Sequence, residues 1–162
     1  MSKKQKNNLV GAAGEYYVCA ELAKRGYLAL LTPKNNPLFD VVVTNEGGSD
    51  AVSIQVKTKS IGNNQGWKLG KSISTKQTNS ELFVVLVDLK EEGRPDFYIY
   101  DYKTLSDSVS EIYEKYRVTP KRDGNKRKDV DFRWFDKASL DMARKDNWGL
   151  ITNKLLEGRK IL

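Results

Sequence analysis

Apolar and small residues recur every three or four positions between residues 9 and 25, and this spacing predicts an amphipathic helix. The positions that share this spacing are Leu9, Ala13, Tyr16, Ala20 and Ala23. Gly26 follows the pattern, and a glycine directly after a helix is typical of its C-terminus. Residues 1–8 are polar and basic, and we expect them to form a flexible arm before the helix.

Strand-like patterns follow the helix. Residues 27–31, 37–43 and 53–57 are rich in Val, Ile, Leu and Phe, and residues 45–48 (Asn-Glu-Gly-Gly) predict a turn between the second and third. Residues 82–87 form a continuous apolar run, which is typical of a central strand covered on both faces. Residues 96–100 are its expected hairpin partner, and Trp67 and Leu69 indicate a short strand in the polar stretch 59–80.

A second helix is expected to begin after Thr104, because Thr104 and Asp107 have the spacing of a capping box. Its apolar positions are Leu105, Val109, Ile112, Tyr113 and Tyr116. A basic loop over residues 117–128 and two aromatic segments, 132–135 and 148–151, follow. The aromatic segments are expected to anchor a C-terminal extension on the sheet, and the alternative is that they form a dimer surface. The element order predicts one α/β (α+β) domain over residues 9–162, with the extension from about residue 117.

The amino-acid composition excludes several kinds of active site. The chain has 162 residues, no histidine and one cysteine, Cys19, which excludes an internal disulfide, the usual zinc sites and Ser-His or Cys-His catalysis. The single cysteine, the absence of a long apolar run and the polar N-terminus predict a cytoplasmic protein without a membrane partner. The net charge of +7 favours a polyanionic partner, although many small proteins are as basic without binding nucleic acid.

Three polar residues on two neighbouring strands form the strongest functional signal. Gln55 and Lys57 are separated by a single residue on a strand, so their side chains project from the same face. If the strands pair, Asp40 lies beside them. A carboxylate, an amide oxygen and a lysine suit a divalent metal ion and a phosphate. Hydrolysis without histidine would depend on such groups.

Glu15 strengthens this hypothesis. Its neighbours one helical turn away are small or apolar, whereas Glu21 lies beside Lys24 and Arg25, as on a solvated helix face. A carboxylate on a packed face costs free energy unless it is paired or binds a metal. We therefore expect Glu15 to be a buried functional acid; the alternative is a structural acid paired with Lys57.

Three motifs follow one another in the sequence: Gly11-Ala-Ala-Gly14-Glu15 opens a helix, Asp40 lies on a strand, and Gln55-Val-Lys57 lies on the next strand. This ordered set resembles the PD-(D/E)xK nuclease superfamily. The closer likeness is to its Holliday-junction-resolvase-like and restriction-endonuclease-like branches. The resemblance implies an αβββαβ core with a mixed central sheet flanked by helices. It also implies that Asp40, Gln55 and Glu15 bind Mg²⁺ or Mn²⁺, and that Lys57 activates the attacking water. Gln55 replaces the usual second acid, so the alternative is a degenerate domain that binds without cutting.

Polar loops flank the predicted site. Lys34 precedes Asp40, and Lys59, Lys68 and Lys71 follow Lys57, so these four lysines are predicted to hold phosphates. Trp67 is predicted to stack on a base, with a core position as the alternative. The combined prediction is a metal-dependent endonuclease acting on nucleic acid, with DNA favoured and with a homodimer for cutting both strands. A nuclease-like subunit that cuts only with a partner is a further alternative.

Overall fold

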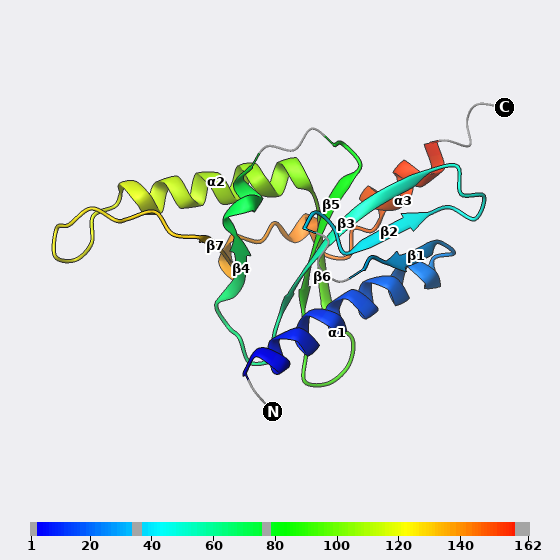
Figure 1. Cartoon of the computed structure of the whole chain (residues 1–162), viewed down its shortest axis with the longest axis horizontal. Helices are drawn as coiled ribbons and strands as arrows, with labels where there is room; N and C mark the ends of the chain where they lie inside the picture. Colours follow the sequence, from blue (N-terminus) through cyan, green and yellow to red (C-terminus); the bar gives the residue numbers. More distant parts are fainter. Residues whose placement is uncertain (1–2, 34–36, 76–78, 158–162) are drawn as a thin grey trace.

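A five-stranded mixed sheet forms the centre of the molecule, in the order β1-β2-β3-β5-β6 (Figure 1). The structure, a computed structural model, describes residues 3–33, 37–75 and 79–157. β1 to β3 form an antiparallel meander, β3 runs parallel to β5, and β6 returns antiparallel to β5. The predicted mixed α/β fold is confirmed. The strands are β1 (Leu28–Leu31), β2 (Val41–Thr44), β3 (Ala51–Lys59), β5 (Leu82–Asp88) and β6 (Asp96–Asp101).

Helices and a small second sheet surround this sheet. The helices are α1 (Lys3–Lys24), α2 (Tyr102–Val118) and α3 (Gly149–Glu157), with three short 3-10 helices at Lys71–Ser74, Lys137–Ser139 and Met142–Arg144. β4 (Gly66–Gly70) pairs antiparallel with β7 (Phe132–Asp136) in a two-stranded ribbon. The predicted strand at Trp67 and Leu69 is therefore present. Within the described residues, no helix has the length and apolar character needed to cross a membrane.

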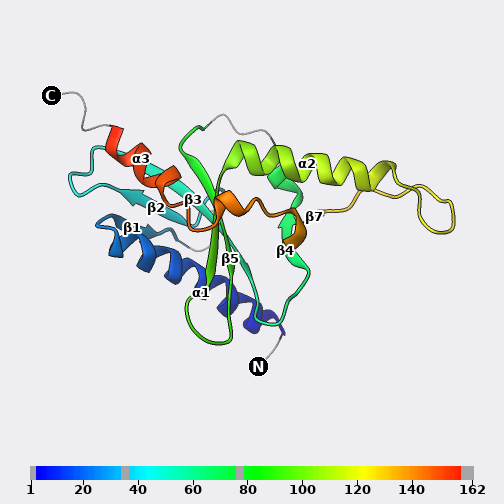
Figure 2. The same cartoon turned by 180° about the vertical axis from the view of Figure 1, so that it is seen from behind.

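Each face of the central sheet packs against a separate hydrophobic cluster. One cluster joins the sheet to α1 and α3, which lie on the same side of it (Figure 2). The other joins the sheet to α2 and the β4–β7 ribbon. β5 contributes to both clusters, since Phe83 and Val85 belong to the first and Val84 and Leu86 to the second. This agrees with the prediction of a strand covered on both faces.

Helix α1 begins earlier than predicted. Residues 3–8, expected to be a flexible arm, are helical, because Lys, Gln and Asn at these positions do not prevent helix extension. Its C-terminus is as predicted. Gly26 has φ +85°, its N–H donates to the Ala23 carbonyl at 2.9 Å, and the Tyr27 N–H donates to the Leu22 carbonyl at 3.1 Å. This left-handed residue ends the helix and turns the chain into β1.

The start of α2 differs from the prediction. Asp101 is the N-cap, and its carboxylate accepts a hydrogen bond from the Thr104 N–H at 2.8 Å. The helix begins at Tyr102, so Thr104 lies inside the first turn rather than before it. Asp107 forms an exposed ion pair with Lys103 at 2.5 Å. The capping-box prediction was wrong because Asp101, at the end of β6, caps the helix first.

Glu21 is buried rather than solvated, so the expectation for this acid was also wrong. Its side chain accepts hydrogen bonds from Arg25 at 2.5 Å and from Arg94 at 2.8 Å. Arg94 lies in the β5–β6 turn and also pairs with Asp146, ahead of α3, at 2.8 Å. The hydrogen bond from Arg94, followed by that from Arg25, lowers the pKa of Glu21 to about 2 despite its burial. Glu21 thus ties α1 to two distant segments.

Candidate functional site

Asp40 is fixed against the middle of β3. Its N–H donates to the Ile54 carbonyl at 2.8 Å, and its carboxylate oxygen Oδ2 accepts a hydrogen bond from the Val56 N–H at 2.7 Å. The β2–β3 register pairs Val41 with Ile54, and both side chains are in the core. Because side chains alternate along a strand, the adjoining residues Asp40 and Gln55 both face away from that core.

Gln55 and Lys57 continue this polar face along β3. Both are half-buried, and both lie opposite the face that carries Ile54 and Val56. In the β3–β5 register their neighbours are Val84 and Leu86, which belong to the cluster beneath α2. The register therefore groups Asp40, Gln55 and Lys57 on one face, beside the edge of an apolar cluster.

Glu15 lies next to a tight contact between α1 and β3. Gly14, directly before it, is buried so tightly against Thr58 that a Cβ at position 14 would overlap the Thr58 side chain. Thr58 follows Lys57, but its side chain lies on the Ile54 and Val56 face of β3, so α1 packs on the sheet face opposite Gln55 and Lys57. Glu15 is half-buried. Burial, with the negative charge of Glu15 as the second cause, raises the pKa of the Cys19 thiol one turn along the helix.

The donor set at this face fits a hard dication. With Oδ2 of Asp40 bonded to the Val56 N–H, no described residue forms a hydrogen bond with Oδ1. The Gln55 amide oxygen on the neighbouring strand is a second hard donor. Within the described parts of the chain, no three His, Cys, Asp or Glu side chains form a metal-binding group. A site here would therefore depend on the amide as well as on Asp40 and Glu15.

Two of the residues predicted to contact nucleic acid are buried. Lys59 is 5% exposed and pairs with Asp88 at 2.5 Å. Trp67 is 2% exposed and donates its indole N–H to the Val87 carbonyl at 3.1 Å, so it is a core residue that cannot stack on a base. Lys68 and Lys71 are exposed, although Lys71 pairs with Asp129 at 2.6 Å. Lys34 lies outside the described residues.

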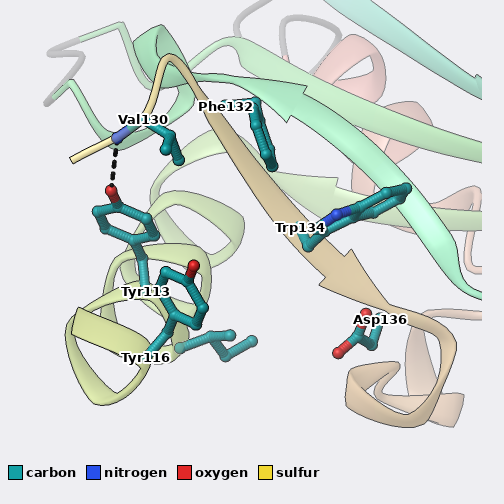
Figure 3. Close-up of a pocket in the computed structure, with 7 residues that line it drawn as sticks. Tyr113, Tyr116, Val130, Phe132, Trp134 and Asp136 are labelled. Atoms are coloured by element: carbon teal, nitrogen blue, oxygen red, sulfur yellow. Dashed lines mark hydrogen bonds between the residues drawn. The ribbon is translucent and has the colours of Figure 1, made fainter. Parts of the chain in front are cut away.

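An aromatic pocket between α2 and β7 was missed by the sequence analysis (Figure 3). The sequence pattern predicts an anchor over residues 132–135, but only alternate residues are buried. Phe135 is 1% exposed, whereas Trp134 is 36% exposed and lines the pocket. Strand alternation over residues 132–136 was the signal that could have separated the anchor from the exposed tryptophan.

Comparisons with known proteins identify the fold. No protein-family profile and no curated protein sequence matches the chain. A bacterial homing endonuclease, I-Ssp6803I, superposes with a TM-score of 0.50 at 17% identity, over 99% of this chain and 100% of that chain. Hjc of Archaeoglobus fulgidus, a Holliday junction resolvase from an archaeal hyperthermophile, superposes with a TM-score of 0.46 at 14% identity, over 82% of this chain and 92% of that one. The near-complete overlap with the homing endonuclease shows that the chain shares the fold of that protein, a mixed central sheet flanked by helices.

Proposed function

We propose that the protein is a metal-dependent endonuclease that hydrolyses phosphodiester bonds in DNA. The observation that supports this most directly is the carboxylate of Asp40, anchored on the Val56 N–H between Gln55 and Lys57. The net charge of +7 is suited to a polyanionic substrate. The fold is shared with a homing endonuclease. The single cysteine is compatible with action in the reducing cytoplasm.

In this proposal Asp40, Gln55 and Glu15 hold Mg²⁺ or Mn²⁺. A bound dication of this kind polarises a phosphoryl oxygen and lowers the pKa of a coordinated water. Lys57 orients the attacking water and offsets the negative charge that develops on the phosphorus-bound oxygens. The water oxygen forms the new bond to phosphorus, the bond to the leaving sugar oxygen breaks, and that oxygen takes up a proton.

The alternative is a nuclease fold that binds nucleic acid or a protein partner without cleavage. Gln55 favours it, because an amide brings no charge where a second carboxylate would bring one. A cleavage assay separates the two proposals. Supercoiled plasmid and short duplexes are incubated with Mg²⁺, Mn²⁺, Ca²⁺ or EDTA, and nicked and linear products are measured. Linear product without a nicked intermediate would favour a homodimer, since one site cuts one strand.

The variants are Asp40→Ala and Lys57→Ala, with Asp107→Ala as an exposed control of the same kind. We expect each site variant to lower cleavage about a hundredfold or more, and the control to cut like the wild type. Cleavage that survives both site substitutions would overturn the site assignment. A folded wild type that binds DNA but cuts no substrate with any metal would favour the binding-only alternative.

A further inference from the structure

The pocket between α2 and β7 has an unusual lining for a surface site. Its volume is about 340 Å³, within the range typical of ligand pockets. Four aromatic side chains and one acid account for most of its wall (Figure 3): Tyr113, Tyr116, Phe132, Trp134 and Asp136. Trp134 is 36% and Tyr116 43% exposed. Aromatic surface that would normally be buried is therefore open to a ligand.

Part of the β7 side of the pocket faces β4 positions that carry no side chain. Phe132, Trp134 and Asp136 share one face of β7. On β4, Gly70 lies opposite Phe132, and Gly66 lies opposite Asp136. Neither glycine has a side chain to cover its neighbour. The φ of Gly66 is positive, a conformation that favours glycine. A Cβ at Gly66 would also overlap the Phe135 backbone, so a larger residue would not fit there. The missing cover opposite Phe132 and Asp136 is thus a consequence of the backbone.

Cations contact the rings from both walls. Lys68 Nζ lies 4.4 Å from the centre of the Phe132 ring, and the Arg127 guanidinium lies 4.4 Å from the centre of the Tyr116 ring. Arg127 belongs to the loop 117–128, which projects with the end of α2 from the body of the molecule (Figure 1). This loop carries six basic side chains and one acidic one, Asp123. The surroundings of the pocket therefore favour an anion, whereas the pocket itself favours an aromatic group.

A second, more open hollow of about 510 Å³ adjoins the pocket and shares Trp134 and Asp136 with it. Its other walls include Asn64, Gln65 and Lys137. Asn64 and Gln65 lie in the connection between β3 and β4, which begins just after Lys57 and Lys59. The two hollows therefore share one wall at Trp134 and Asp136, and the second is lined in part by the connection that follows β3.

We propose that this pocket binds one unpaired nucleobase of a nucleic-acid strand, stacked on Trp134. Asp136 accepts a hydrogen bond from a base amino group, and the loop 117–128 holds the flanking phosphates. A base in a duplex has its faces and pairing edge covered, so only an extruded or unpaired base can enter. This inference rests on the proposed function for nucleic acid as the partner. It adds that the substrate contains an unpaired base.

Fluorescence and binding measurements test the proposal. Trp67 and Trp148 are 2% and 3% exposed, so Trp134 is the one exposed tryptophan of the three in the chain. In EDTA, a duplex with one bulged base should quench the fluorescence of the wild type, and the fully paired duplex should not. Trp134→Ala should weaken binding of the bulged duplex about 5- to 150-fold, as expected from loss of one base stack. Binding of the paired duplex should change less than about twofold.

Two controls make the result decisive. Trp134→Phe should keep most of the preference for the bulge, and Leu156→Ala, an exposed apolar residue on α3, should bind both duplexes like the wild type. An equal loss on both duplexes, an unchanged affinity, or no binding at all would overturn the pocket proposal. So would sedimentation showing that Trp134→Ala converts a dimer into a monomer, because the pocket would then be a self-interface.

The two proposals fail separately. Selective, Trp134-dependent binding without cleavage in any metal would count against the proposed endonuclease and leave the pocket proposal intact. Cleavage that depends on Asp40, without any preference for an unpaired base, would count against the pocket alone.

Discussion

Gly14 of α1 and Thr58 of β3 are in direct contact, and this contact sets how closely the helix approaches the strand. The Thr58 hydroxyl is buried there, and none of the described residues forms a hydrogen bond with it. Glu15 follows Gly14, and Lys57 precedes Thr58. The position of the candidate acid relative to the candidate lysine therefore depends on the absence of a side chain at residue 14.

Gly14→Ala should destabilise the protein by about 1–3 kcal/mol, because its methyl group overlaps the Thr58 side chain in a packed interface. A Cβ added at Gly11, in the same helix, would have no neighbouring atom within 4 Å. Gly11→Ala should stabilise the protein by up to about 1 kcal/mol. Urea denaturation of both variants measures the difference. Thr58→Ala added to Gly14→Ala should restore part of the loss. Equal stability of the two glycine variants would contradict the contact.

Asp101→Ala should cost about 1 kcal/mol, because it removes the side chain that accepts the Thr104 N–H at the start of α2. Asp107→Ala is the matched control, since Asp107 is exposed and makes only a helix-surface ion pair. Its stability should stay near that of the wild type. Thermal unfolding followed by circular dichroism compares the two. A larger effect at Asp107 would support the capping box predicted from the sequence.

Glu21→Gln should destabilise the protein at neutral pH by about 2 kcal/mol, the order expected for charge-assisted hydrogen bonds to a buried acid. The substitution removes the charge that Arg94 and Arg25 share. The pKa of Glu21 is lowered from 4.5 to about 2, so its contribution is present above about pH 4.5 and is lost as the pH falls toward about 2. The stability difference between wild type and variant should therefore shrink over this window.

Glu111→Gln is the control for this pH dependence, because Glu111 belongs to an exposed surface pair. An exposed pair contributes little to stability, so the control should differ little from the wild type across the same window. Urea denaturation at a series of pH values measures both variants. A Glu21→Gln difference that stays constant down to the acid end of the window would refute the assigned partners.

Gln55→Glu should tighten Mg²⁺ binding roughly tenfold, because it adds a carboxylate to the proposed ligand set. Isothermal titration of the folded variant with Mg²⁺ measures this affinity without any nucleic acid. Gln55→Ala, which removes the amide oxygen, is the matched control. Gln55→Ala should weaken binding relative to the wild type. If all three proteins bind Mg²⁺ equally, residue 55 is not a ligand.

The elements with strong local patterns were predictable from the sequence. The apolar run of β5, the glycine at the end of α1 and the short strand at Trp67 all depend on neighbouring residues, and each is present in the structure. The likeness of Glu15, Asp40 and Gln55-Val-Lys57 to the nuclease superfamily pointed to the fold that the structural comparison shows.

The errors concern partners that are distant in sequence. Glu21 has the local surroundings of a solvated acid, and only Arg94, 73 residues away, explains its burial. Lys59 lies next to the candidate site in sequence, but its partner Asp88 is on the adjacent strand β5. The exposed position of Trp134 depends on residues 132–136 forming a strand, which pairs with β4 from a distant part of the chain.

The alternation of β3 has an evolutionary consequence. Ile54 and Val56 belong to the core. Gln55, which lies between them, and Lys57, which follows Val56, do not. A substitution at residue 55 therefore changes the proposed chemistry without disturbing the packing beneath it. A lineage with this strand can exchange an amide for an acid at the proposed metal site through a single-codon change while the folded protein persists. Glutamine and glutamate codons differ by one base, so the step between an amide and an acid at this position is a short one.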